Sequence, residues 1–315
     1  MTVATFLRIG LVVQVGTGFA LARWLLPDSF GWLALPIGLA IPLVGTGLVL
    51  AFEFVVGAAT DPRTPPLPLA KVVAVWWTET EISTRMFSFS QPFSAGFAEP
   101  VLVNDPARPA VLLVHGYLCN RAVWRALLDS GRLAGCNVAT INLEPIFGPI
   151  ERYGEVLRDA VEKLRAASGA QQVVLIGHSM GGLAIRAYLR QCGDAAVAKV
   201  ITLATPHHGT VFGALGAGAN SKQMAVGSAF ILDLVQSLSP ALVAKFLCVG
   251  TRDDNLIVPR SSPLLSGARQ ILLERVGHLA LTEDPRAWQV LHEELNRLDT
   301  TAYRPGGQRV IDSAM

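Results

Sequence analysis

A serine between two glycines is the residue of this sequence with the clearest chemical meaning. Ser179 lies in GHSMG, with Gly177 and Gly181 two positions away on either side. An apolar run ends just before it and a helical pattern begins at Met180, which predicts a sharp turn from a buried strand into a helix. Glycines leave the space that such a turn needs, and the turn exposes the serine oxygen above the sheet. The pattern indicates a nucleophile for acyl transfer, and an incidental serine in a glycine-rich turn is the alternative.

A nucleophilic serine needs a base and an acid from other parts of the chain. The adjacent His178 cannot reach back along its own backbone to the serine oxygen and is expected to pack elsewhere. His278 in RVGHLAL follows the last apolar run, and Asp254 in GTRDDNLIVP follows the run before it, which is the order that a strand-to-helix elbow requires. We therefore predict that His278 transfers the serine proton and that Asp254 fixes the tautomer of the His278 ring. Asp253 is the competing candidate for the acid.

Two backbone amides are the expected donors to a tetrahedral oxyanion. In VHGYLCNRAVW, Gly116 permits a turn that aims the Tyr117 N–H at the same point as the Met180 N–H, and His115 is then structural. The paired histidines of TPHHGT are expected to fix backbone near the site. A metal is not predicted there, because neighbouring side chains rarely converge on one ion.

These residues follow short apolar runs that alternate with amphipathic stretches. Repeated strand and helix units predict a mostly parallel sheet with helices on both faces. Helical patterns are centred on 121–130, 153–167, 180–192 and 284–298. The predicted strands are 110–116, 138–143, 173–177, 199–205, 245–251 and 270–276.

A segment rich in glycine and alanine, residues 211–240, interrupts this alternation. It suits either a lid or acyl-binding wall over the site, or ordinary core packing. The apolar residues at helical spacing within it are Phe230, Ile231, Leu234, Val235 and Leu238.

The chain is too apolar for an ordinary soluble enzyme. Of its 315 residues, 51% are hydrophobic and 16% charged, and the mean hydropathy is +0.43. Segments 6–26 and 30–59 are each long enough to cross a bilayer, and only Pro27, Asp28 and Ser29 separate them. They predict a transmembrane hairpin, and several small residues would allow close packing of its helices: Gly16, Gly18, Gly38, Gly45 and Gly47.

A cleaved signal peptide is the alternative for the first segment, because Ala20–Ala22 resembles a cleavage site. The apolar run continues beyond it to Leu26, which favours the hairpin. Arg8, Arg23 and Glu53 lie near enough to the segment ends to snorkel, and no function is assigned to them.

Charge and cysteine usage predict the side of the membrane. Positive residues (Arg63, Lys71, Arg85) follow the second segment and are absent from the linking turn, which places both termini in the cytoplasm. The cysteines occur without CxxC pairs, which fits reduced thiols in a domain that faces the cytosol: Cys119, Cys136, Cys192 and Cys248.

The chain divides into four predicted parts. Residues 1–60 form the transmembrane hairpin, and the helix-breaking TDPRTPPLPLA then opens a linker at 61–99. Within the linker, KVVAVWWTETEISTRMFSF can form either an interfacial helix or a helix packed on the domain surface. The α/β domain occupies 100–300, and 301–315 form a C-terminal tail.

At these motifs the sequence resembles the bacterial lipase and esterase branch of the α/β-hydrolase superfamily. HGYLCNRAVW, GHSMGG, TPHHGT, DDNLIVP and GHLAL occur in the family's order over about residues 110–282. The resemblance implies an α/β-hydrolase fold, here preceded by two transmembrane helices. It assigns the nucleophile, acid, base and two oxyanion donors to Ser179, Asp254, His278, Tyr117 and Met180. The hairpin departs from the secreted members, so their extracellular role is not carried over.

We therefore expect a membrane-anchored serine hydrolase that cleaves carboxylic esters, with acyl or lipid substrates, through an acyl-enzyme and without a cofactor. A thioesterase or acyltransferase on the same site is one alternative, and a non-catalytic membrane interaction module is another. Nucleic acid is not an expected partner, because the sequence has no basic run.

Overall fold

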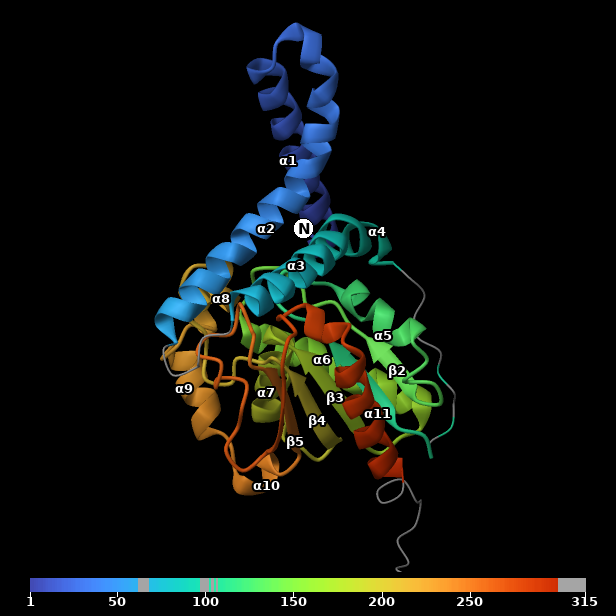
Figure 1. Ribbon diagram of the computed structural model, residues 1–315. Coiled ribbons are helices and arrows are strands. Elements are labelled where there is room, and N and C mark those ends of the chain that lie inside the picture. Colours follow the sequence, from blue (N-terminus) through green and yellow to red (C-terminus); the bar gives the residue numbers. More distant parts are fainter. Residues whose placement is uncertain (62–67, 97–101, 103–104, 106, 300–315) are drawn as a thin grey trace, which may run out of the picture.

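Six parallel strands form the central sheet of the computed structural model, which describes residues 1–61, 68–96, 102, 105 and 107–299 (Figure 1). Their order is β2-β1-β3-β4-β5-β6, and all five neighbouring pairs are parallel. The carboxyl ends of the strands therefore share one edge, and the predicted α/β class is confirmed. The strands are β1 Ala110–Val114, β2 Asn137–Thr140, β3 Val173–His178, β4 Val197–Leu203, β5 Phe246–Thr251 and β6 Arg269–Leu273.

Four strands end two or three residues earlier than predicted: β1, β2, β4 and β6. The run 138–143 leaves the sheet after Thr140, and the Leu143 N–H donates to His115 Nε2 (2.9 Å) in place of a neighbouring strand. The last strand likewise ends at Leu273, short of its apolar run. The hydrogen-bond partners, and not the length of the apolar run, decide where a strand ends.

Helices cover both faces of the sheet, because successive strand residues face opposite sides. In β1, Leu112 packs into one core cluster and Leu113 into the other, and both are fully buried. The first cluster includes α6, α7 and α9, and the second includes α5 and α11 (Figure 1). These helices are α5 Arg125–Asp129, α6 Ile150–Ser168, α7 Met180–Cys192, α9 Ala229–Gln236 and α11 Pro285–Asp299, with short 3-10 turns at Arg121–Trp124 (η3) and Ala280–Thr282 (η5).

The segment 211–240 folds into short helices on the domain. They are η4 Val211–Ala214, α8 Gly218–Gln223 and α9, followed by α10 Pro240–Val243. Phe230, Ile231 and Leu234 of α9 are buried in the core cluster to which α7 contributes. Core packing is therefore the correct alternative for these three residues, whereas Val235 on the same helix is exposed.

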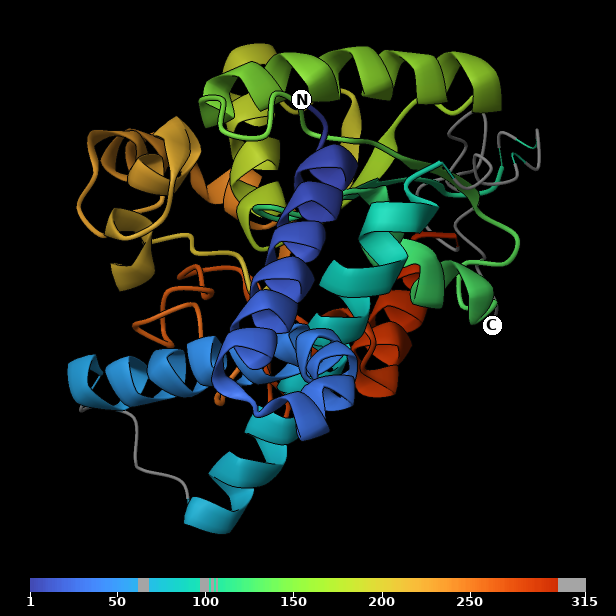
Figure 2. The ribbon, with the colours of Figure 1, turned by 90° about the horizontal axis from the view of Figure 1, so that it is seen from above.

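Two long apolar helices form a hairpin that projects from the domain (Figures 1 and 2). They are α1 Val3–Leu25 and α2 Ala34–Thr60, joined through the 3-10 turn η1 Asp28–Leu33. Both are long and apolar enough to cross a membrane, and they are mostly exposed. They meet closely at Gly18, where a Cβ would lie 3.2 Å from the Gly38 Cα. The predicted close packing is therefore confirmed at this pair, whereas Gly16 and Gly45 face open space.

The helix predicted in the linker packs on the domain beside α2. It is α3 Leu69–Arg85, which continues into the π-helical turn η2 Met86–Ser90 and the short α4 Gln91–Ser94. Trp76 Nε1 donates to the Gly47 carbonyl of α2 (2.8 Å). One face of α3 is buried and carries residues one turn apart: Val75, Glu79 and Ser83. Residues 62–67 and 97–99 of the predicted linker, and the predicted tail 301–315, lie outside the described residues.

Candidate active site

Ser179 lies on the sharp turn between β3 and α7. Its φ of 54° and ψ of −127° are strained for a residue with a side chain, and its N–H donates to the Leu203 carbonyl (2.8 Å). A Cβ on Gly181 would lie 2.4 Å from the Val114 carbonyl oxygen, and one on Gly177 would lie 2.7 Å from a backbone nitrogen of α7. The steric reason predicted for both glycines is therefore confirmed.

Asp254 and His278 form a buried hydrogen-bonded pair. His278 Nδ1 lies 3.1 Å from Asp254 Oδ2, so Nδ1 carries the proton and Nε2 is free to accept one. The other carboxylate oxygen of Asp254 accepts the N–H groups of Leu256 (2.9 Å) and Ile257 (2.7 Å). Burial by itself lowers the pKa of His278, but the charge and hydrogen bond of Asp254, with a smaller contribution from Glu79, raise it above its ordinary value.

The neighbouring carboxylate, Asp253, takes no part in this pair. Its Oδ2 accepts the Arg275 N–H, and its Oδ1 has no hydrogen-bond partner among the described residues. Of the two aspartates weighed from the sequence, Asp254 is the one that contacts the histidine.

His178, expected to pack away from the serine, packs beneath the ring of His278. The two ring centroids are 4.7 Å apart, and His178 Nε2 lies 3.1 Å from the His278 carbonyl oxygen, to which it donates. Burial lowers the pKa of His178 well below its ordinary value, so the ring is neutral. Among the described residues, Ser179 and His278 share no hydrogen bond, a contact that substrate binding commonly tightens in such pairs.

The residues predicted as oxyanion donors flank the serine. Gly116 approaches it closely, since a Cβ there would lie 2.9 Å from the Ser179 Cβ, and Tyr117 follows. Met180 begins α7. The Tyr117 hydroxyl donates to the Ala217 carbonyl (2.7 Å) and so ties this turn to the 211–240 segment. The donor role of the two backbone amides stays a prediction.

The other histidines near the site hold backbone and side chains in place. His115 Nδ1 donates to the Gly116 carbonyl (2.9 Å). His207 Nε2 lies 3.1 Å from Thr202 Oγ1, and His208 Nε2 lies 3.1 Å from the Leu264 carbonyl oxygen. These contacts agree with the structural role expected for the paired histidines of TPHHGT.

Comparison with known proteins identifies the α/β-hydrolase fold that the sequence motifs predict. A family model described as the α/β-hydrolase fold matches residues 109–221. Over 114 residues the chain is 37% identical to a triacylglycerol lipase of Pseudarthrobacter phenanthrenivorans (33% of this chain, 35% of the relative). The same identity and length of match relate it to a triacylglycerol lipase of Burkholderia plantarii (33% of this chain, 31% of the relative). The match thus spans about a third of each of these relatives.

Solved structures extend the likeness over most of the chain. The mature Bacillus licheniformis lipase BlEst2 superposes with a TM-score of 0.55 at 19% identity, covering 62% of this chain and 95% of that one. Aspergillus fumigatus lipase B superposes with a TM-score of 0.59 at 16% identity, covering 91% of this chain and 85% of that one. The domain has the α/β-hydrolase fold and resembles lipases and esterases.

A cavity of about 330 Å³ reaches Ser179 in the α/β domain. The sequence predicts a wall from the 211–240 segment, and part of that segment does line the cavity, although the lining residues precede α9. A second wall comes from α2 of the hairpin, which the sequence does not predict. The apolar lining residues are Val49 and Phe52 of α2, Phe212, Leu215 and Met224 of the segment, and Leu256 and Ile257 of the loop after β5.

Two carboxylates to which the sequence interpretation gave no role in the site contact the loops that carry Asp254 and His278. Glu53, expected to snorkel, reaches the α/β domain instead, where its Oε2 accepts a hydrogen bond from Asn255 Nδ2 (2.6 Å). Asn255 Oδ1 in turn accepts the His278 N–H (3.0 Å). Glu79 of α3 accepts the N–H groups of Leu279 and Ala280, the two residues that follow His278. The available signal for Glu79 was its place one turn after Val75, on the inward face of an expected helix.

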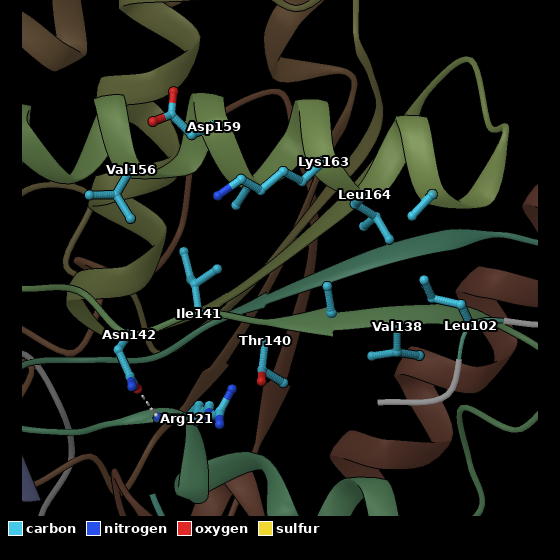
Figure 3. A pocket seen from close by; sticks show the side chains of 13 residues that line it. Leu102, Arg121, Val138, Thr140, Ile141, Asn142, Val156, Asp159, Lys163 and Leu164 are labelled. Carbon is cyan, nitrogen blue, oxygen red and sulfur yellow. Dashed lines mark hydrogen bonds between the residues drawn. The ribbon is translucent and has the colours of Figure 1, made fainter. Parts of the chain in front are cut away.

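A larger cavity, of about 550 Å³, lies away from this site, between the edge strand β2 and α6 (Figure 3). Val138 and Ile141 line it from the strand side, and Val156 and Leu164 from the helix. None of the residues proposed for the chemistry lines it, so the smaller cavity is the candidate substrate site.

Proposed function

We propose that this chain is a membrane-anchored serine hydrolase that cleaves carboxylic esters with apolar acyl groups. The observation that carries the proposal is the strained Ser179 turn beside a buried Asp254–His278 pair in which the histidine has a free Nε2. Strained turns of this kind are kept where a nucleophile must be presented, and the pair supplies a base of fixed tautomer.

The reaction proceeds in two acyl-transfer steps. His278 Nε2 takes the proton of Ser179 Oγ as this oxygen attacks the ester carbonyl carbon, and the Tyr117 and Met180 N–H groups stabilise the resulting oxyanion. His278 then protonates the departing alcohol, which leaves an acyl group on Ser179. Water attacks this acyl-enzyme with His278 again as base, and the carboxylic acid departs. Asp254 holds the Nδ1 proton and stabilises the imidazolium throughout.

The apolar cavity supports an acyl substrate. Its walls present aliphatic and aromatic side chains to Ser179, which favour an acyl chain over a charged group. The curated relatives are named triacylglycerol lipases, which agrees with an acyl ester or lipid ester as substrate.

The hairpin supports an anchor in the cytoplasmic membrane, with the hydrolase domain on the cytoplasmic side. Two helices of sufficient length and apolar character project together from the domain (Figure 1). Both helices are mostly exposed, and lipid would cover their apolar side chains. The excess of positive residues after the second helix favours the cytoplasmic orientation.

The direct test is labelling of the detergent-purified chain with a fluorophosphonate probe, which reacts covalently with an activated serine. We expect labelling at Ser179, its loss in Ser179→Ala, and hydrolysis of p-nitrophenyl esters that improves as the acyl chain lengthens. Absence of labelling in folded protein, or full hydrolysis by Ser179→Ala, would overturn the proposal. Labelling without ester turnover in water would direct attention to thioesters or to another acyl acceptor.

A further inference from the structure

The N-terminal helices hold the backbone of the proposed catalytic histidine. Glu79 of α3 accepts the Leu279 N–H on Oε1 (2.6 Å) and the Ala280 N–H on Oε2 (2.9 Å). A Cβ on Gly277 would lie 2.3 Å from Glu79 Oε2, so the backbone on the other side of His278 also rests on this carboxylate. One side chain of α3 thus contacts the chain on both sides of the histidine.

This carboxylate is costly to keep in the fold. Glu79 is 1% exposed, and no salt bridge neutralises it among the described residues. Burial raises its pKa to about 7, against the two N–H donors that lower it. An apolar side chain of similar size would fill the same space without this penalty, although it could not hold two N–H groups.

A second arm reaches the same histidine from α2. Glu53 Oε2 accepts from Asn255 Nδ2 (2.6 Å), and Asn255 Oδ1 accepts the His278 N–H (3.0 Å). Asn255 directly follows the proposed acid Asp254. Together, α2 and α3 therefore contact both the loop that carries Asp254 and the loop that carries His278.

We propose that Glu79 is a positioning residue of the hydrolase: α3 uses it to fix the 277–280 backbone so that His278 stays aligned with Asp254 and Ser179. The Glu53–Asn255 contact is the supporting second arm. This inference rests on the proposed function. It makes the N-terminal helices part of the catalytic apparatus as well as an anchor.

The carboxylate also acts on the charge of His278. The titratable groups around this ring are Asp254 after β5, Glu79 on α3, Glu53 on α2 and His178 on β3, which is neutral. Each of the three carboxylates favours the imidazolium that forms when His278 accepts the serine proton. Where Glu79 is ionised, removing its charge therefore lowers the pKa of His278.

The test compares Glu79→Gln, Glu79→Asp and the control Glu81→Gln in full-length protein, with p-nitrophenyl butyrate as substrate. Glu81 lies two residues further along α3 and is exposed. In Glu79→Gln the side chain keeps one acceptor and opposes a backbone N–H with its own NH₂. We expect kcat to fall about 10- to 100-fold with little change in KM. We also expect the acid limb of the kcat/KM profile to move to lower pH. Glu79→Asp keeps the charge and should retain the wild-type limb, and Glu81→Gln should match wild type throughout.

The outcomes separate this inference from the proposed function. Fluorophosphonate labelling of wild type tests the nucleophile alone. If wild type is labelled and Glu79→Gln keeps both kcat and the acid limb, Glu79 has no positioning role. A fall in kcat with an unmoved limb and a lowered melting temperature in all Glu79 variants would indicate a purely structural role and would also overturn it. If Glu79→Gln fails to fold, Glu53→Gln tests the second arm, with a smaller fall in kcat expected.

Discussion

The outer and inner parts of the N-terminal helices are both apolar but make different contacts. In the outer part, around Val15 and Gly38, α1 and α2 pack on each other, and a Cβ on Gly38 would lie 2.9 Å from the Val15 carbonyl oxygen. In the inner part, around Glu53 and Gly57, α2 packs on the α/β domain, and a Cβ on Gly57 would lie 3.4 Å from a Val258 side-chain carbon. The inner part also carries Glu53. Hydropathy alone therefore identifies the hairpin, whereas Glu53 distinguishes the part of α2 that contacts the candidate site.

The largest effect is expected from a substitution that removes the proposed chemistry and leaves both parts of the hairpin unchanged. Ser179→Ala should lower ester turnover by about 10⁴-fold or more, because the proposed nucleophile is removed. Membrane retention and melting temperature should stay as in wild type. Neither the fold nor the hairpin depends on a contact of the Ser179 side chain. Turnover, sedimentation with membranes and thermal unfolding provide the three measurements. A variant that loses membrane retention would contradict the separation.

A nearly equal loss is expected for Asp254→Asn. The amide cannot hold the Nδ1 proton as the carboxylate does, so turnover should fall on the order of 10³- to 10⁴-fold. The matched control is Asp253→Asn, whose side chain contacts the Arg275 N–H and not His278. It should keep activity within about tenfold of wild type, any loss coming from stability. The reverse ranking in a turnover assay would transfer the acid role to Asp253.

The three proposed catalytic residues also show how far the sequence alone can predict the site. Ser179, Asp254 and His278 each lie just beyond a strand, and apolar runs mark those strands locally. The parallel sheet then brings the strand ends together without further information. The spacing of apolar residues also predicts the sheet and its covering helices, with errors only at strand ends such as Thr140.

The contacts that the sequence did not predict join distant parts of the chain. Glu79 and Leu279 are 200 residues apart, and Glu53 and Asn255 are 202 apart. No local pattern states that a helix after the hairpin will return to the carboxyl edge of the sheet. The 211–240 segment teaches the same lesson, because the spacing of Phe230 and Leu234 is equally suited to a lid and to a core helix.

Truncation before Pro62 tests whether the inner part is needed. From the sequence alone this cut should release a domain that keeps all three proposed catalytic residues. The structure leads us to expect at least about tenfold lower turnover of short esters, because Glu53 and the cavity wall formed by Val49 and Phe52 are lost. Turnover per labelled Ser179 is the measurement, so that misfolded protein is not counted. Full turnover of water-soluble esters by the truncated domain would show that α2 is only an anchor.

The smallest effect on chemistry is expected in the outer part, where a matched pair of glycines is available. Gly38→Leu would push a side chain into the Val15 backbone, which should destabilise the hairpin by about 1–3 kcal/mol. Gly45→Leu adds the same side chain where no atom lies within 4 Å and should be tolerated. Both variants should hydrolyse short esters at close to the wild-type rate, because neither glycine contacts the site. Thermal unfolding in detergent distinguishes the two, and a loss of short-ester turnover in Gly38→Leu alone would mean that the outer part acts on the site through α2.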